Sequence, residues 1–139
     1  MAVYSQNLPI KTRGDCEIVD LTDALRNAVE ASGIQTGIAL VFVAGSTAGL
    51  TTMEYEPGLL ADLPEFFERF VPRNAGYHHE QTWHDGNGHS HVRASLLGQS
   101  LSLPVDGGKP TLGTWQQVVL IDFDNRSRQR EVLVRVVGE

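Results

Sequence analysis

All five histidines of the chain lie within the fourteen positions from His78 to His91, in the stretch HHEQTWHDGNGHSH. Neutral imidazoles bind divalent metals such as Zn²⁺, and three of them together with a water molecule form an open, reactive metal site. Clustered histidines can also be ordinary surface residues, or a polar cluster in which the rings satisfy one another. The stretch therefore leaves three interpretations: a metal site, a polar cluster or unconnected surface residues.

The spacing of His89 and His91 restricts the geometry of a metal site. Two positions apart on a continuous helix, their side chains would point about 200° away from each other and could not share an ion. They converge only if His89 precedes a helix that begins near Ser90, or follows an extended lead-in after Asn87. On this geometry we predict that the metal ligands are His79, His89 and His91.

The choice of the first of these ligands stays open in the sequence. His78, His79 and His84 all precede the expected helix, and no paired-cysteine or H-E-x-x-H spacing distinguishes them. The metal expected at imidazole ligands is Zn²⁺ or a similar transition metal.

The beginning of the same helix is also suited to an anion, because unpaired backbone N–H groups and the positive end of the helix dipole lie there. Arg93 follows one turn later, and the small-residue loop AGSTAG supplies two hydroxyl groups. The loop lacks the P-loop pattern, so a plain turn between strands is the alternative, as is a solvated helix position for Arg93. The predicted phosphate-binding residues are Ser46, Thr47 and Arg93.

Two acidic residues could join this chemistry. Glu54 ends an extended segment whose alternation turns it to the same face as Thr52. Asp62 is most simply the N-cap of a helix that begins with Pro64 in its first turn, although it could also hold Mg²⁺ or orient a histidine. The predicted catalytic residues are Glu54, Asp62 and His91.

Composition excludes several kinds of partner. The net charge of −6 gives no basic surface for nucleic acid or for an anionic membrane, so we expect small-molecule partners. Cys16 is the only cysteine, which rules out a disulfide within the chain, and we expect it at a buried or edge position of a strand rather than as a reactive thiol. No apolar run approaches the twenty or so residues that span a bilayer, and no leader is evident, so the expected location is the cytoplasm.

The length of 139 residues and a hydrophobic content of 41% predict one domain covering residues 1–139. The expected fold class is α+β: a β-sandwich of mostly antiparallel strands with about three helices. The helices are expected over 22–32, after Asp62 to about residue 70, and from Ser90 to Gly98. Strands are expected over 2–10, 15–20, 37–45, 46–55, 100–105, 113–123 and 131–137.

Two further expectations concern the end of the chain. The alternating segments 113–123 and 131–137 flank the polar turn DNRSR and are expected to pair as a hairpin. Trp115, at the start of the first segment, is expected to be buried in the core rather than to stack on a ligand.

Three stretches, GSTAGLTTMEYEPGLLADL, GNGHSHVRASLLG and LGTWQQVVLIDFDNRSR, resemble the YjbQ-like family in their order and spacing. The resemblance covers essentially the whole chain and implies a homotrimer of α+β sandwiches with a histidine-containing cleft near a subunit boundary. Members of the family are associated with a secondary thiamine-phosphate synthase activity. The residues that match the family pattern are Glu54, Asp62, His79, Asn87, His91, Trp115 and Gln116.

The activity implied by the resemblance is that of a transferase. It would join hydroxymethylpyrimidine diphosphate to thiazole phosphate and release pyrophosphate, with Mg²⁺ neutralising the leaving group. The alternative is a histidine-rich metal-binding or ligand-binding trimer without turnover. This sequence departs from the common family form at Gly45, where many members have histidine, and at Met53, where they have asparagine, so a contact made by those residues is missing here.

Overall fold

The computed structural model describes residues 1–139 and confirms an α+β domain built of mostly antiparallel strands. The helices are α1 (Thr22–Ser32), α2 (Pro57–Phe70), α3 (His79–Trp83) and α4 (Gly88–Leu97). The strands are β1 (Ala2–Thr12), β2 (Glu17–Asp20), β3 (Thr36–Val43), β4 (Ala48–Met53), β5 (Ser100–Asp106), β6 (Lys109–Pro110), β7 (Gln117–Asp122) and β8 (Arg128–Gly138). The helices are all too short or too polar to cross a bilayer.

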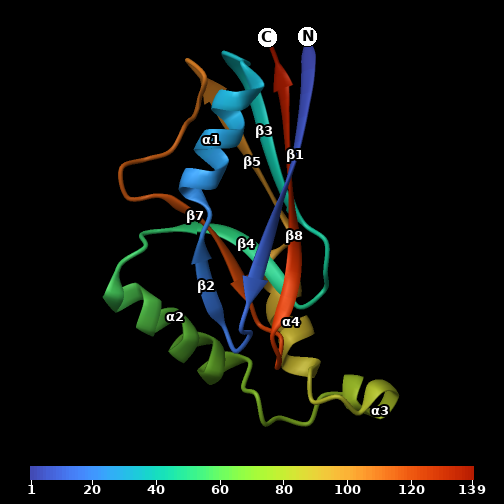
Figure 1. Ribbon diagram of the computed structural model, residues 1–139. Helices are drawn as coiled ribbons and strands as arrows, with labels where there is room; N and C mark the ends of the chain where they lie inside the picture. The colour runs from blue at the N-terminus through green and yellow to red at the C-terminus, as the bar shows by residue number, and fades with distance from the viewer.

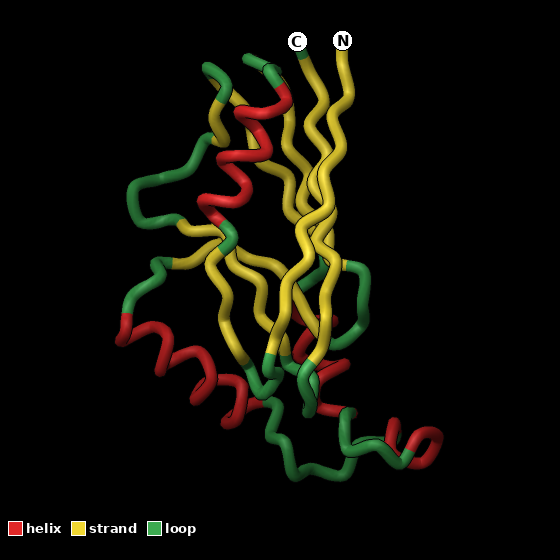
Figure 2. Tube along the Cα trace, viewed as in Figure 1, coloured by secondary structure: helices red, strands yellow, loops and turns green.

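The strands form two sheets. The larger sheet has the order β1-β8-β3-β5-β6 and the smaller one β2-β7-β4, and every neighbouring pair is antiparallel. Figure 1 shows the long strands β1, β8 and β3 side by side, with both chain termini at one end of the molecule and helices α3 and α4 at the opposite end. Figure 2 shows α1 and α2 on one side of the long strands and α3 and α4 at the lower end of the molecule, with no helix running along the other side of the strands.

The main core lies between the two sheets and under α1. Alternate residues of β3 point inward, so that Ala39, Val41 and Val43 are buried while Ile38 and Phe42 face outward. The inward residues of β8 and one face of β7 complete this core, together with the apolar stripe of α1. Helix α1 ends where expected, at Gly33 in the left-handed conformation.

A second, smaller core lies on the other side of the smaller sheet. Val119 and Ile121 of β7 pack there against Phe67 of α2 and Ala94 of α4. Strand β7 is therefore covered on both faces, which explains its almost continuous apolar sequence VVLI.

The expected hairpin of the last two long strands is wrong. Strand β7 belongs to the smaller sheet and β8 to the larger one, so the chain crosses between sheets in residues 123–127. Asp122, at the end of β7, and Arg130, near the start of β8, form a buried ion pair across this crossing while each stays in the ladder of its own sheet. The chain crosses between the sheets in the same way at residues 44–47, between β3 and β4.

The start of α2 also differs from expectation. The helix begins at Pro57, and the carboxylate of Glu56 caps it by accepting hydrogen bonds from the backbone N–H groups of Gly58 and Leu59. Pro64 is tolerated inside the helix, and Asp62 is an exposed mid-helix residue rather than a cap. Thr22 is the first residue of α1, and its hydroxyl donates to Asp20.

A buried ionic network lies where the chain crosses from β7 to β8. The guanidinium of Arg130 donates to both carboxylate oxygens of Asp122, from Nε at 2.8 Å and from Nη2 at 2.9 Å. The neighbouring Asp124 accepts from Thr47 Oγ1 at 2.8 Å and from Arg128 Nε at 3.0 Å. Both aspartates are fully buried, so each depends on these partners to remain charged.

Replacing Arg130 with methionine keeps most of the side-chain volume but leaves the Asp122 carboxylate buried without its partner. We expect the free energy of unfolding to fall by about 3–5 kcal/mol. Urea unfolding measures this change. Arg13→Met is the matched control, because Arg13 pairs with Glu17 at the surface and its loss should cost no more than about 1 kcal/mol. Equal losses in the two variants would contradict the role of the buried pair.

Candidate functional site

Three loops meet at the end of the molecule opposite the termini. The backbone N–H of Phe123 donates to the carbonyl of Thr47 at 2.9 Å, which joins the two crossings between the sheets. The segment between α3 and α4 is fastened to them by Asn125, whose side chain donates to the Asp85 carbonyl at 2.7 Å. The Asn87 side chain in turn accepts from the Asn125 backbone N–H at 3.2 Å. The histidine-rich segment is thus held against the end of β7.

Glu80 organises the segment that precedes α4. Its carboxylate accepts hydrogen bonds from the backbone N–H groups of Gly86 at 2.7 Å and Gly88 at 3.0 Å. These two bonds are the main reason that the pKa of Glu80 lies below its usual value, because they favour the charged form. The second bond satisfies a donor at the first residue of α4, which would otherwise lack a partner.

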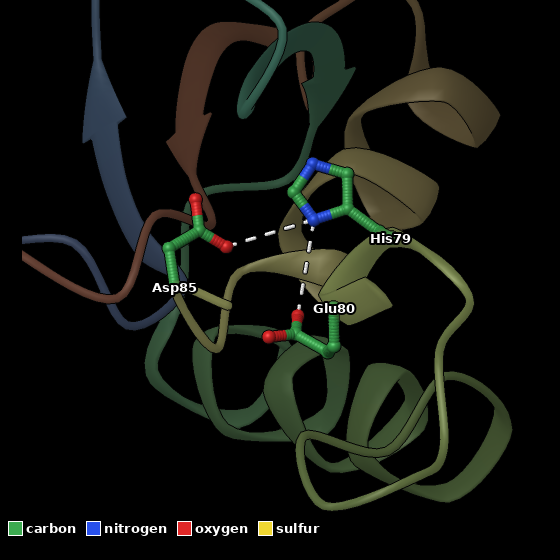
Figure 3. A group of neighbouring side chains, drawn as sticks. All are labelled: His79, Glu80 and Asp85. Atoms are coloured by element: carbon green, nitrogen blue, oxygen red, sulfur yellow. Dashed lines mark ion pairs between the residues drawn. The ribbon is translucent and has the colours of Figure 1, made fainter. Parts of the chain in front are cut away.

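The ring of His79 faces two carboxylates. Its Nδ1 lies 3.6 Å from Asp85 Oδ1 and 3.8 Å from Glu80 Oε1, and both carboxylates point toward this nitrogen (Figure 3). The nitrogen is buried and has no hydrogen-bond partner. Ligand atoms around a tetrahedral ion with bonds of about 2.0 Å lie roughly 3.3 Å apart, close to the separations seen here. The three residues can therefore hold a metal ion after small side-chain adjustments.

His91 lies directly beside this group. Its ring packs on that of His79, with ring centroids 4.3 Å apart and an angle of 35° between the planes. Burial lowers the pKa of His91, and the neighbouring His79 lowers it further, against the opposing effect of Asp85 and Asp124. The imidazole is therefore neutral near pH 7 and has a lone pair to offer to a metal or a proton.

His89 does not join this group, so the expected convergence of His89 and His91 is wrong. Helix α4 begins at Gly88, which places both histidines on a continuous helix and turns them to opposite faces. His89 is buried against the body of the protein, where it lines a separate cavity with Cys16 and Arg93. Burial is the main reason that the pKa of His89 is lowered and that the pKa of the Cys16 thiol rises to about 11.

The three predicted phosphate-binding residues are not brought together. Arg93 is 5% exposed, and it donates to the Val71 carbonyl and to the Glu68 carboxylate on the face of α4 away from His91. Thr47 is buried, and its hydroxyl is occupied by Asp124 and Arg130. Ser46 is exposed on the crossing loop.

The predicted catalytic acids also lie elsewhere. Glu54 is exposed at the far end of β4, roughly 20 Å along the strand from the crossing loop at about 3.3 Å per residue. Asp62 is exposed in the middle of α2. Of the three predicted catalytic residues, only His91 lies beside the group formed by His79, Glu80 and Asp85. Trp115, expected in the core, is 71% exposed in the loop before β7.

Sequence reasoning missed Glu80 and Asp85. Glu80 directly follows His79, and Asp85 directly precedes the glycine turn that leads into α4. The turn at Gly86, which has a φ of +69°, bends the chain back so that Asp85 faces His79. The sequence signal for both residues is an acidic side chain within seven positions of a predicted histidine ligand. Asp85 also stands next to a glycine, where the chain can turn back.

The fold and the cluster define a small two-sheet α+β protein that carries a histidine–carboxylate group where its chain crosses between the sheets. The pattern of the family described as "UPF0047 protein YjbQ-like" matches residues 6–139, and the chain belongs to this family. The resemblance stated from the sequence motifs is confirmed.

Relatives match along almost the whole chain. A UPF0047 protein of Archaeoglobus fulgidus is 40% identical over 130 residues, covering 94% of this chain and 98% of its own length. Another from Methanothermobacter thermautotrophicus is 40% identical over 139 residues, covering 100% and 95%. The crystal structure of a YbjQ-like protein of unknown function from Sulfolobus solfataricus is 36% identical, with a TM-score of 0.94 and 99% of each chain covered.

The expected thiamine-phosphate synthase activity is contradicted by these comparisons. The relatives are described only as UPF0047 proteins, and the similar solved structure as a protein of unknown function. The geometry agrees with this correction, because Arg93 and Thr47 are engaged in internal contacts and are not gathered around a site for a diphosphate.

Replacing Glu80 with glutamine removes the charge and one of the two acceptor oxygens. We expect hydrogen exchange at the Gly86 and Gly88 amides to accelerate by roughly tenfold, because their charge-assisted bonds are weakened or lost. Exchange measured by NMR tests this expectation. Glu65→Gln, an exposed position on α2, is the control and should leave both amides unchanged. Unaltered exchange in the Glu80 variant would show that the carboxylate does not hold the loop.

Proposed function

We propose that the chain is a metal-binding protein whose metal ligands are His79 Nδ1 and the carboxylates of Asp85 and Glu80. The observation that carries the proposal is the buried Nδ1 of His79, which has no hydrogen-bond partner and faces two carboxylate oxygens at 3.6 and 3.8 Å. A buried polar atom without a hydrogen-bond partner is costly. A divalent ion bound between the three atoms removes this cost and neutralises both carboxylates.

The ligand types favour a transition metal. One nitrogen and two oxygens suit Zn²⁺, Mn²⁺ or Fe²⁺, whereas Mg²⁺ prefers oxygen ligands and retained water. The expectation of Mg²⁺ depended on the transferase reaction, which is no longer supported. Zn²⁺ is therefore the proposed ion, and it can also stand in for Mn²⁺ or Fe²⁺ in binding experiments.

A site with three protein ligands keeps a position open for water or for another ligand. His91 is suited to this fourth position, either as a further ligand or as a base that takes a proton from a metal-bound water. Its packing against His79 and its lowered pKa support both roles, since a neutral ring is required for each.

His79→Ala removes the only nitrogen ligand of the proposed core, so its affinity for Zn²⁺ should fall by more than about 100-fold. Asp85→Asn should lower the affinity in the same direction. Isothermal titration with Zn²⁺, with metal content checked by mass spectrometry on untagged protein, measures both effects.

His84→Asn is the matched control for this titration. It removes an exposed histidine from the same segment, and asparagine tolerates the left-handed conformation found there, with a φ of +51°. The control should bind Zn²⁺ as the wild type does. Equal affinities in the wild type and in His79→Ala would refute the proposed metal site.

We also propose that the chain assembles as a homotrimer through the outer face of the larger sheet. This face exposes Ile38, Leu40 and Phe42 of β3, and the register places Ile38 opposite Val137 of β8. No helix runs along this face (Figure 2), which also carries Arg135 opposite Leu40 and, further along, Glu131 and Lys11. A second copy that packs on this surface would bury its apolar side chains and would have to supply a partner for Arg135, and the family resemblance supports three copies.

Phe42→Glu places a charge in the middle of this face. We expect the mass in solution to fall from three chains to one, because the charge would be buried without a partner in the assembly. Light scattering after size-exclusion chromatography measures the mass. Arg26→Glu on α1 is the control and should remain trimeric. A monomeric wild type would contradict the assembly.

A further inference from the structure

A cavity of about 310 Å³ lies on the face of α4 that is turned away from His91. Its walls come from three parts of the chain: the turn between β1 and β2, the end of α2 and helix α4. The most buried of its lining residues are Cys16, His89 and Arg93, which are 7%, 2% and 5% exposed. Two of these carry a thiol and an imidazole, which are both metal-binding groups.

Two ion pairs join the walls of this cavity. Arg73 Nη1 lies 2.6 Å from Asp15 Oδ1 and ties the β1–β2 turn to the segment after α2. Arg93 Nη2 donates to Glu68 Oε2 at 3.0 Å and ties α4 to α2. Cys16 is held in the left-handed conformation, with a φ of +65°, which is uncommon for a residue other than glycine. The thiol is therefore positioned by a constrained turn whose surroundings are linked to one another.

His89 brings an unpaired lone pair to the same cavity. The Ser90 hydroxyl donates its one hydrogen to the Phe123 carbonyl at 2.6 Å, so in its 3.3 Å contact with His89 Nε2 the ring nitrogen is the donor. With the proton on Nε2, the neutral ring keeps a lone pair on Nδ1. This atom is buried and has no hydrogen-bond partner. The unpaired nitrogen is independent of the thiol, and it indicates a ligand that accepts a lone pair.

The burial of Nδ1 favours a metal ion over a water molecule or an organic ligand. A hydrogen-bonding atom lies about 2.9 Å from its partner, and this nitrogen has almost no accessible surface for such an atom. A metal ion bonds to an imidazole nitrogen at about 2.0 Å and so occupies space closer to the ring. The Cys16 thiol lines the same cavity and can supply a second ligand.

The surrounding charges favour a monovalent ion. Burial is the main reason that the pKa of His89 is lowered, and the positive charges of Arg93 and Arg73 lower it further. The same charges oppose a divalent ion, because a divalent ion with one thiolate would leave a net positive charge in the interior. A monovalent ion and a thiolate are neutral together. Soft thiolate ligands select Cu⁺, and two donors are enough for this ion.

We propose that Cys16 and His89 bind one soft monovalent metal ion of the class of Cu⁺, held between the thiolate sulfur and Nδ1 of the imidazole. This site is separate from the Zn²⁺ site proposed above and does not depend on it. Binding replaces one S–H bond with one sulfur–metal bond, and the proton passes to solvent, so no oxidant or reductant is needed. Burial raises the pKa of the thiol to about 11, so the proton is present near pH 7 until the ion displaces it.

Anaerobic titration with Cu⁺, in competition with the chromophoric chelator bicinchoninate, measures the affinity of this site. We expect untagged wild-type protein to withdraw one Cu⁺ per chain from the chelator. Cys16→Ser should lower the affinity by more than about 100-fold, because a hydroxyl group is a hard ligand. His89→Gln should lower it by at least about tenfold, since the amide can still donate to Ser90 but offers no ring nitrogen.

His79→Ala is the matched control, because it removes a histidine from the other site and should bind Cu⁺ as the wild type does. A roughly tenfold excess of Zn²⁺ should not displace the ion. Displacement by Zn²⁺, or an unchanged affinity in Cys16→Ser, would overturn the inference. An unchanged affinity in His89→Gln would also overturn it, because the complex would then be an adventitious one with the thiol alone.

X-ray absorption by the Cu⁺-loaded wild type tests the site without any substitution in the buried region. We expect a coordination shell of one sulfur and one imidazole nitrogen. A shell without sulfur, or a shell without imidazole, would contradict the proposed pair of ligands. The Zn²⁺ titration of the first site is unaffected by either result, so the two proposals stand or fall separately.

Discussion

The pairing of Asp122 with Arg130 is the constraint on which the rest of the structure depends. These two residues lie on either side of the turn where the chain leaves one sheet and enters the other, and both are buried. A charge in the interior requires a partner with good geometry, and here the guanidinium binds both oxygens of the carboxylate. The pair ties the end of β7 to the start of β8 at the point where the chain passes from the smaller sheet to the larger one.

The candidate site is built outward from this network. Thr47, on the other crossing loop, accepts from Arg130 and donates to Asp124, which fixes the two crossings relative to each other. The next turn holds Asn125, which binds the segment from Asp85 to Asn87. A chain of hydrogen bonds thus runs from the buried ion pair to the residues that face His79. These bonds fix the position of the site relative to the core.

Part of the fold could be predicted from the sequence because local patterns agree with the final structure. The alternation in β3 and the glycine that ends α1 are local signals, and the motifs around Ser46, His91 and Trp115 are sufficient to indicate the family. The pairing of β7 was not predictable in this way. A strand covered on both faces looks the same in sequence whether its partner is the next strand or a distant one.

The site was predicted less well than the fold, because its ligands depend on where one helix begins. A start at Ser90 would have left His89 outside the helix, whereas the bonds that Glu80 makes to Gly86 and Gly88 bring the start forward to Gly88. The same carboxylate therefore starts the helix and faces His79. Residue types alone do not show that Glu80 both binds the start of α4 and faces His79. The first role depends on backbone N–H groups, which nearly every residue has.

The five histidines are consequently not one functional unit, although they lie within fourteen residues. The period of α4 divides them: His89 and Arg93, four residues apart, face the body of the protein, while His91 and Ser95 line a hollow on the opposite face. His79 is added to the second group by the turn at Gly86, which brings α3 back against α4. His78 and His84 are exposed at the two ends of the short helix α3. Helix geometry thus turns a cluster in sequence into one buried histidine, two exposed ones and a pair that shares a carboxylate-lined site.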